Sequence, residues 1–427
     1  MQVTRITTLA VAVLALVACN DDRAPSVTAP PPVPPLSAFV PEAAGSSALK
    51  RYVSIGTSVS MGWQSDGVNA ESQSQSWPAQ LSRLAGTEMD IPYLEGTGCK
   101  APIAAPLAAN TRTSGEPLNV SDAVALCTSL KPGIDLPARN VALAGATTYD
   151  ALYSTPQNIG NALFSRLAQS ILPQGTPQLY AAVGQNPKVL SIELGANEVL
   201  QARSGVAIPG VTIFPTANWI PLYNTVADTA AKYAQRVLLT GLIIDVGTFP
   251  SFRRGSEIFA DAPTLLAAFN VLVSPDCDGS QNLIFVPVRV PTAIATGDYY
   301  RRNNLGHYVF SCADGGTGVQ DYVLTPAEAG VVNGTMAAMS AHIRATVRRL
   351  DAAYFELESL YGMPGLKPPF SAVQLMTSAQ PYGPYISLDG IHPSEAGHAV
   401  LAKAAARALN DRYKLRIPTS SSVVASR

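Results

Sequence analysis

Short, almost uninterrupted apolar runs are the feature of this sequence that most constrains its fold. They lie at residues 50–56 (KRYVSIG), 140–145 (NVALAG), 188–195 (KVLSIELG) and 237–246 (VLLTGLIIDV). A strand with one wet face alternates apolar and polar residues, whereas a parallel strand covered on both faces is apolar throughout. These runs therefore predict the strands of a buried parallel sheet.

Helical patterns separate the runs. Residues 158–171 place Ile159, Leu163 and Leu167 four positions apart, which puts them on one helical face. Further helical patterns cover residues 219–236, 325–349 and 393–412. A fifth strand is expected at 353–357. Strands that alternate with helices predict a doubly wound α/β fold.

Three segments fit no strand–helix rhythm, namely residues 96–139, 202–217 and 247–324. We interpret them as loop insertions in one domain that covers residues 47–415, followed by a polar tail at 416–427. At about 150 residues per domain, 427 residues would instead suggest two or three domains. Long loops in compact domains are usually functional, and ligand sites of α/β folds form at strand ends.

Charge excludes one class of partner. The chain has 29 Lys and Arg against 30 Asp and Glu, a net charge of −1, and only 14% of its residues are charged. Nucleic-acid binding requires a basic face, and the sequence contains no such cluster. We therefore expect no nucleic-acid partner.

The N-terminus has the pattern of an export signal. One positive charge at Arg5 precedes an apolar stretch that is too short to span a bilayer, and the stretch ends Leu-Val-Ala-Cys19. This resembles a bacterial lipobox, which predicts a signal peptide at 1–18 and lipidation of Cys19. Residues 19–46 then form a proline-rich linker. The resemblance implies a protein anchored by lipid to the cell envelope, with the outer membrane as the expected destination.

Export also explains the remaining cysteines, Cys99, Cys127, Cys277 and Cys312. An even number in an oxidising compartment predicts disulfides, and four cysteines allow three connectivities. We expect nearest-neighbour pairing, Cys99–Cys127 and Cys277–Cys312. A metal site is the rival interpretation, but no metal-ligand spacing is present, so none is predicted.

Two segments carry the residue types of a serine hydrolase. Ser58 follows the first predicted strand directly, where a turn into a helix would expose its hydroxyl at the carboxyl edge of the sheet. Asp389 and His392 lie near the other end of the chain in the segment DGIHP. A carboxylate this close could accept the Nδ1–H bond of the imidazole and fix its tautomer. The neighbouring serines Ser54 and Ser60 are the alternative nucleophiles.

Four motifs in this order resemble the SGNH hydrolase (GDSL esterase/lipase) superfamily. The motifs are Gly56-Thr57-Ser58 with Gly62, then NVALAGATT around Gly145, then Gly195-Ala196-Asn197, and last Asp389 to Pro393. The resemblance implies a flavodoxin-like three-layer αβα sandwich with a mainly parallel five-stranded sheet. It also implies a triad of Ser58, His392 and Asp389, with an oxyanion hole formed by Ser58, Gly145 and Asn197.

The first motif departs from the family pattern, because Thr57 stands where the family usually has Asp. That Asp is not a triad member, so the chemistry survives, but the hydrogen bonding of the turn must differ. Two polar residues near the motifs, Glu193 and His398, are interpreted as structural. The aromatic residues that flank the motifs, Trp63, Tyr382 and Tyr385, are candidates for the acyl pocket.

The leading hypothesis is a lipid-anchored esterase or lipase that forms an acyl-enzyme and needs no cofactor. A second is a carbohydrate O-deacetylase or an acyltransferase with the same site, since the sequence leaves open whether the ester belongs to a lipid, a glycan or another small molecule. A third is a non-catalytic surface binding lipoprotein, which only Thr57 favours. The oligomeric state is not predicted.

Overall fold

The structure, a computed structural model, describes residues 45–419, which lie within one compact unit. The predicted signal peptide, Cys19 and almost all of the linker lie outside this range. Within it, no helix combines the length and the apolar composition that a membrane span requires. The first helix, α1 (Gly45–Leu49), begins inside the segment expected to be linker, and its Ala48 and Leu49 are buried.

A four-stranded parallel sheet forms the centre of the fold. Its order is β1 (Tyr52–Gly56), β2 (Val189–Glu193), β3 (Arg236–Gly241) and β9 (Ala353–Glu356). Every residue of the first three strands is buried, which is why their sequences are mostly apolar. Three of the four apolar runs and the fifth expected strand are therefore strands of this sheet.

The run at 140–145 lies beside β1 but is not a regular strand. Ser54 donates to Arg139 O and accepts from Val141 N, each at 3.0 Å, so the pairing is parallel. One step further, the amide of Gln178 donates to both Gly56 O and Val141 O, at 2.8 and 3.0 Å. Leu143 N also donates to Gly56 O at 3.0 Å, so the Gln178 amide adds to the parallel pairing at this step. With this segment counted second, the sheet order is 2-1-3-4-5, the flavodoxin-like order.

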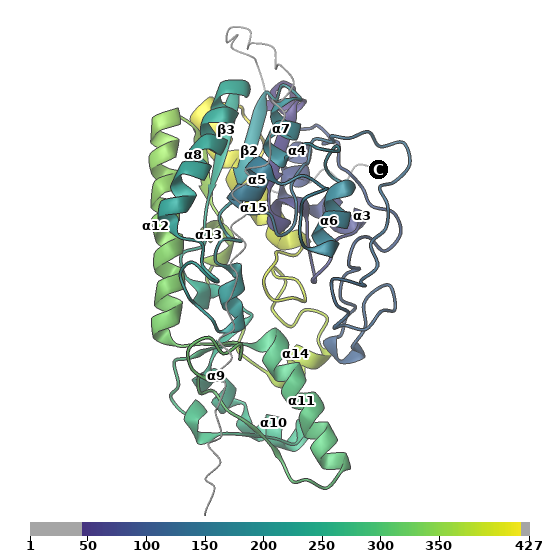
Figure 1. Ribbon diagram of the computed structural model, residues 1–427, viewed down its shortest axis with the longest axis vertical. Helices are drawn as coiled ribbons and strands as arrows, with labels where there is room; N and C mark the ends of the chain where they lie inside the picture. Colours follow the sequence, from purple (N-terminus) through teal and green to yellow (C-terminus); the bar gives the residue numbers. More distant parts are fainter. Residues whose placement is uncertain (1–44, 420–427) are drawn as a thin grey trace, which may run out of the picture. The chain divides into compact units, whose positions relative to one another are not determined.

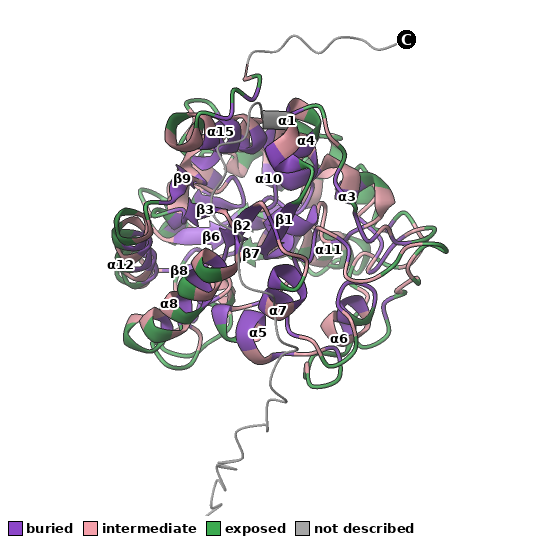
Figure 2. Ribbon diagram, turned by 90° about the horizontal axis from the view of Figure 1, so that it is seen from above, coloured by how far each residue is buried: buried purple, intermediate pink, exposed green. Residues whose placement is uncertain are grey.

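Helices cover both faces of the sheet and complete three layers (Figure 2). On one face lie α4 (Trp77–Leu84) and α15 (Glu395–Tyr413). The other face is covered by α5 (Thr148–Tyr153), α7 (Gln178–Val183), α8 (Thr216–Tyr233) and α12 (Pro326–Leu350). Alternate strand residues enter the two cores: Tyr52 packs with the first group, and Val53 and Ile55 with the second. The pattern predicted at 158–171 forms the shorter helix α6 (Ala162–Gln169).

The third predicted insertion, residues 247–324, is not a loop but a folded subdomain, drawn in the lower part of Figure 1. Its strands are β4 (Phe252–Arg254), β6 (Leu283–Phe285) and β8 (Val323–Leu324) in one antiparallel sheet, and β5 (Val271–Val273) with β7 (Tyr308–Phe310) in a parallel pair. Its helices are α9 (Gly255–Ala260), α10 (Ala262–Phe269) and α11 (Val286–Arg302). Such short strands carry no detectable period, and Pro291 inside α11 hides that helix.

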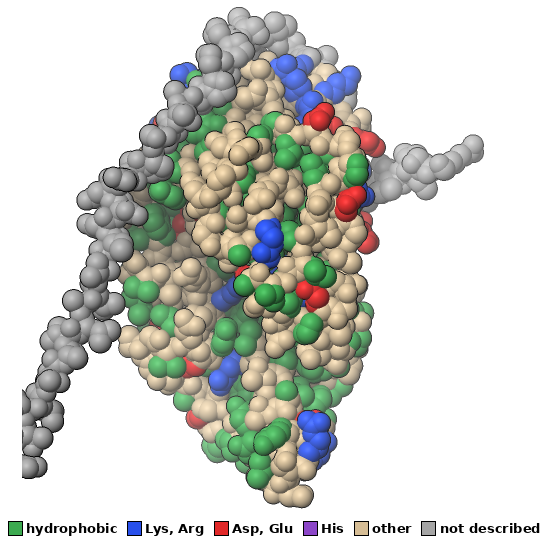
Figure 3. Space-filling view, turned by 45° about the vertical axis from the view of Figure 1, so that its right-hand side comes forward, with side chains coloured by type: hydrophobic (Ala, Val, Ile, Leu, Met, Phe, Trp, Pro, Cys, Tyr) green, Lys and Arg blue, Asp and Glu red, His purple; other side chains and the backbone are tan. Residues whose placement is uncertain are grey.

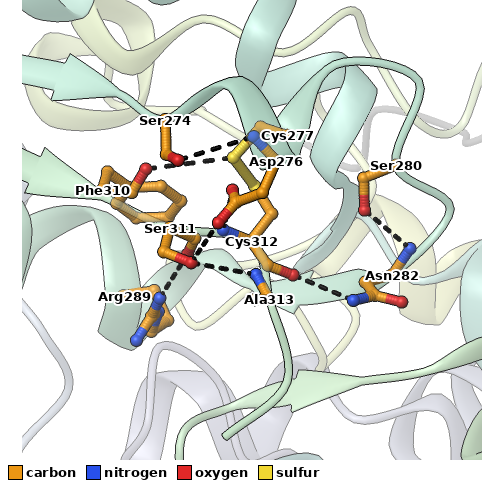
Figure 4. Close-up of a disulfide and its surroundings, with 10 residues drawn as sticks. All are labelled: Ser274, Asp276, Cys277, Ser280, Asn282, Arg289, Phe310, Ser311, Cys312 and Ala313. Carbon is orange, nitrogen blue, oxygen red and sulfur yellow. Dashed lines mark hydrogen bonds between the residues drawn. A yellow bond between two sulfur atoms is a disulfide. The ribbon is translucent and has the colours of Figure 1, made fainter.

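Both disulfides form with the expected nearest-neighbour pairing, Cys99–Cys127 and Cys277–Cys312. Figure 4 shows the second, which ties 3₁₀ helix η4 (Pro275–Cys277) to the segment after β7. Asp276 extends this link, since its carboxylate accepts from Ser311 Oγ at 2.5 Å and from Cys312 N at 2.9 Å. The first disulfide fastens the segment 96–139, which is irregular as expected.

The core extends past the predicted start of the C-terminal tail. Ile417 is 3% exposed, and its backbone N and O both bond the side chain of Asn410 on α15, at 2.7 and 2.8 Å. The chain is therefore packed against α15 for two residues beyond 415.

Candidate active site

Ser58, His392 and Asp389 meet at the carboxyl end of β1 although 334 residues separate the first two. His392 Nε2 lies 2.9 Å from Ser58 Oγ, and His392 Nδ1 lies 2.8 Å from Asp389 Oδ2. All three side chains are almost completely buried, with Ser58 7%, His392 8% and Asp389 9% exposed. The side chains predicted as nucleophile, base and orienting acid are thus in hydrogen-bond contact in that order.

Ser58 is placed by a sharp turn from β1 into the one-turn helix α2 (Ser58–Met61). Position 56 requires glycine, because a Cβ there would lie 2.6 Å from Ser60 Oγ. Gly62 ends the helix with φ 89°, and a Cβ there would lie 2.3 Å from Ser72 O. The two glycines therefore allow the turn that holds the Ser58 hydroxyl at the sheet edge.

The buried carboxylate of Glu193, at the end of β2, explains the threonine at position 57. Thr57 donates from N and Oγ1 to Glu193, each at 2.9 Å, and Ser60 donates from N and Oγ at 3.2 and 3.0 Å. Burial raises the pKa of Glu193, and these four donors act in the opposite direction. Glu193 thus anchors the nucleophile turn from the neighbouring strand, in agreement with the structural role expected for it.

One backbone N–H group of this turn has no acceptor among the described residues. Thr57 N and Ser60 N donate to Glu193, and Val59 N donates to Thr57 Oγ1 at 3.5 Å. Among residues 45–419, Ser58 N has no hydrogen-bond acceptor. A free N–H at a helix start is suited to binding an oxyanion.

Asp389 is held as a carboxylate by four N–H donors. Its Oδ1 accepts from Ile391 N and His392 N, each at 2.9 Å, and its Oδ2 accepts from Asp66 N at 2.8 Å as well as from the imidazole. Burial alone would raise the pKa of Asp389, but the charge of His392 and these hydrogen bonds lower it to about 2. Asp389 is therefore ionised at neutral pH.

The two middle motifs are bonded to each other. Asn197 Nδ2 donates to Ala146 O at 2.7 Å, and the buried Glu198 accepts from Thr148 N at 2.7 Å. Gly145 directly precedes Ala146 and has φ 78°, and a Cβ there would lie 2.5 Å from the ring of Phe164. Its N–H has no acceptor among the described residues, and the Asn197 amide has a second hydrogen to donate.

Two cavities open beside Ser58 and His392. A narrow one of about 80 Å³ touches Ser58, Asn197 and His392, and apolar side chains form most of its wall. These wall residues include Leu242, Val246, Phe249, Phe252, Leu324, Val332, Met336 and Tyr361. A wider cleft of about 750 Å³ reaches Asp389 and His392 and is lined by residues from all three predicted insertions. Charged side chains are few and scattered on the face shown in Figure 3.

The aromatic residues predicted to line the acyl pocket do not do so. Trp63 and Tyr382 are packed in the core, at 4% and 1% exposed, and neither they nor Tyr385 line the narrow cavity. The aromatic rings that do are Phe249, Phe252 and Tyr361, which come from the third insertion and the segment after β9. Tyr361 also donates from its hydroxyl to Ile391 O at 2.7 Å, next to the catalytic candidate His392.

His398 is a buried neutral histidine. It is fully buried on α15, its Nδ1 accepts from Trp77 N at 3.3 Å, and desolvation together with the charge of His392 lowers its pKa to about 3. It therefore caps the first turn of α4, as its structural interpretation predicts.

One group of side chains within the described residues has the spacing of metal ligands, Asp276 with Cys277 and Cys312. Both sulfur atoms belong to a disulfide, so they offer no thiolate to a metal ion.

Comparison with known families agrees with this geometry. The family model described as GDSL-like Lipase/Acylhydrolase matches residues 52–405. Because the match covers most of the chain, the protein belongs to this family. No curated protein matches the chain.

Proposed function

We propose, on the premise that this chain is a GDSL-like hydrolase, that it is a serine esterase or lipase that cleaves carboxylic esters. The observation that carries the proposal is the chain of two hydrogen bonds, 2.9 Å from Ser58 Oγ to His392 Nε2 and 2.8 Å from His392 Nδ1 to Asp389 Oδ2. This is the arrangement that activates a serine hydroxyl as a nucleophile.

The reaction proceeds through an acyl-enzyme. His392 Nε2 takes the Ser58 proton while Ser58 Oγ bonds to the ester carbonyl carbon, and Asp389 stabilises the imidazolium that forms. The tetrahedral intermediate collapses as His392 gives that proton to the leaving alcohol. Water then attacks the acyl-enzyme with His392 as base, which releases the carboxylic acid and restores Ser58.

The oxyanion is stabilised by N–H groups that have no other acceptor. Within residues 45–419, neither Ser58 N nor Gly145 N has an acceptor, and the Asn197 amide keeps one hydrogen available while Ala146 O accepts the other. Preorganised donors of this kind cost no reorganisation when charge develops on the carbonyl oxygen.

The apolar wall of the narrow cavity supports an acyl chain as its occupant. It begins at Ser58 and continues between Phe249, Val332 and Met336, where a fatty acyl group would replace water against apolar side chains. The leaving alcohol then faces the wider cleft beside His392. We propose that the substrate is an ester with an apolar acyl group.

A carbohydrate O-deacetylase or acyltransferase is the second candidate, favoured by polar side chains in the wider cleft. Asn110, Asn119, Gln201 and Gln320 line it and could bond sugar hydroxyls. A panel of p-nitrophenyl esters from acetyl to palmitoyl, run beside acetylated sugars, separates the candidates. Faster turnover of acetylated sugars than of every acyl ester would favour the second.

We further propose that the enzyme is exported and anchored by lipid on Cys19 at the cell envelope, with the outer membrane as the destination. The lipobox pattern and the proline-rich linker support this proposal, and both lie outside the described residues. Cys19→Ser should move the protein from the membrane fraction to the soluble fraction.

The nucleophile is tested by Ser58→Ala, which should abolish ester hydrolysis without changing the melting temperature. Ser74→Ala, at the end of α3 (Ala70–Gln75), is the matched control and should keep full activity. Retention of activity in Ser58→Ala would refute the proposed function.

A further inference from the structure

A two-residue turn packed against the Asp389 loop has an unusual backbone conformation. Gln64 and Gly67 exchange two backbone hydrogen bonds, and the residues between them, Ser65 and Asp66, have φ of 52° and 54°. Hairpin turns of this kind normally place Asn or Gly at these positions, since other side chains are strained there. Such a conformation persists only when its surroundings hold it. We call residues 64–67 the clamp turn.

One side of the clamp turn holds the segment that carries Asp389. Ser65 N donates to Ser387 Oγ at 2.9 Å, and Ser65 Oγ accepts from Leu388 N at 3.2 Å. Asp66 N donates to Asp389 Oδ2 at 2.8 Å, the same oxygen that accepts from His392 Nδ1. The turn therefore fixes the orientation of the carboxylate as well as the path of its backbone.

The other side is held by the first insertion. Arg112, which is 3% exposed, donates from Nη1 to Asp66 O at 3.0 Å and pairs through Nη2 with Asp66 Oδ2 at 2.6 Å. Lys100 Nζ lies 2.9 Å from the same oxygen, and Ile103 N donates to Ser65 O at 2.7 Å. Lys100 directly follows Cys99, whose disulfide to Cys127 encloses Arg112 in the closed loop. Every backbone N–H and C=O of Ser65 and Asp66 thus has a partner.

We propose that the clamp turn positions the triad acid, that Asp66 is a positioning residue for catalysis, and that the first insertion acts on the reaction through Arg112 and Lys100. The proposal rests on the proposed function, because it assigns a role relative to the Ser58–His392–Asp389 triad. It also gives the first disulfide-bonded insertion a catalytic purpose distinct from lining the cleft.

The physical consequence concerns the imidazolium. When Asp66 loses its anchor, the clamp turn relaxes and Asp389 Oδ2 no longer points steadily at His392 Nδ1. The imidazolium that forms on His392 is then less stabilised, so the rate of proton transfer at Ser58 falls. The other titratable groups that interact with Asp389 or His392 are Tyr361, Tyr382 and His398. None of these bonds Asp66, so a change at Asp66 reaches the triad through Asp389.

The test is Asp66→Asn, which keeps the backbone N–H but removes the charge that pairs with Arg112 and Lys100. The side chain of Asp66 is 37% exposed, so the substitution should leave the fold intact. Asp351→Asn is the matched control: Asp351 has φ 54° and pairs with Arg412, but it lies before β9, at the opposite edge of the sheet. We choose p-nitrophenyl acetate as the substrate because its acyl group is small. Its hydrolysis by the unaltered enzyme is measured alongside.

We expect Asp66→Asn to lower kcat about 10- to 100-fold with KM within about twofold. Asp66→Gly suits the turn conformation but also lacks the carboxylate, and it should be equally impaired in kcat. Asp351→Asn should leave kcat and KM unchanged.

Two results would overturn the proposal: an unchanged kcat, or a loss confined to KM. If the unaltered enzyme hydrolyses the ester and Ser58→Ala does not, these results count against the clamp-turn proposal alone. If the unaltered enzyme does not hydrolyse the ester, the proposed function itself has failed.

Discussion

Restoring the family's usual aspartate at position 57 should destabilise this protein. Thr57 Oγ1 donates to both Glu193 oxygens at 2.9 Å in a fully buried site, so Thr57→Asp would place a second carboxylate against the first. Two like charges about 4 Å apart repel by about 4 kcal/mol at an effective dielectric constant of 20. The alternative is to protonate one carboxyl, which at 1.36 kcal/mol per pH unit costs up to about 3 kcal/mol more at pH 8 than at pH 5.5.

The penalty should therefore depend on pH. The shared proton gives the carboxyl pair a folded-state pKa above its unfolded value, so the stabilisation from this proton is present at low pH and is lost as pH rises through the folded-state pKa. We expect urea unfolding to show Thr57→Asp destabilised by up to about 4 kcal/mol at pH 8 and by less at pH 5.5. Adding Glu193→Gln should remove most of the deficit at pH 8, because a neutral amide can donate to the new carboxylate.

Glu193→Gln alone, with Thr57 in place, is the control, and it should not raise the stability at pH 8 above that of the unaltered protein. If Thr57→Asp were as stable as the unaltered protein at pH 8 with Glu193 in place, then Glu193 does not determine the residue at position 57.

Further predictions concern the site and its surroundings. Asn197→Ala should lower kcat by about 10²–10³-fold with a small change in KM, measured by steady-state ester hydrolysis, because one oxyanion donor is lost. Asp389→Asn should lower kcat by about 10⁴-fold, since the imidazole tautomer is no longer fixed. Val332→Phe should shift preference in the ester panel toward shorter acyl chains, whereas Val331→Phe, on the exposed side of the same helix, should not. Replacing both Cys99 and Cys127 by Ala should cost about 3–4 kcal/mol in urea unfolding.

The sheet could be predicted because its strands are buried on both faces and so leave a strong local signal. The runs at 52–56 and 189–193 are mostly apolar, and each ends in a glycine or an acidic residue at the carboxyl edge. The segment at 140–145 has a similar composition and pairs with β1, yet it forms no regular strand, and Gln178, far away in sequence, bonds the carbonyls of both segments. Side-chain bonds of this kind leave no trace in a local pattern.

The site residues could be predicted because each lies within a short motif, but their supports could not. Glu193 was recognisable as a charge in an apolar strand, although its partners Thr57 and Ser60 were not. The clamp turn was missed entirely, since Ser65 and Asp66 contain no glycine and their partners lie 322 and 323 positions away. Such contacts are decided by tertiary packing.

The aromatic residues predicted to line the narrow cavity are not the ones that line it. Aromatic side chains close to the motifs in sequence, such as Tyr382, are packed in the core, while Phe249 and Phe252 come from a segment expected to be a loop. The third insertion escaped prediction because its strands have three residues or fewer. A cavity formed between distant segments can be identified only once the fold brings them together.

The central claim is that Ser58 is the nucleophile of an ester hydrolase. Labelling with a fluorophosphonate, followed by mass spectrometry of the peptide that contains Ser54, Ser58 and Ser60, tests it most directly. The account predicts one adduct, on Ser58, formed at a rate that falls sharply in His392→Ala. An adduct on another serine, or no adduct on a folded protein, would contradict it.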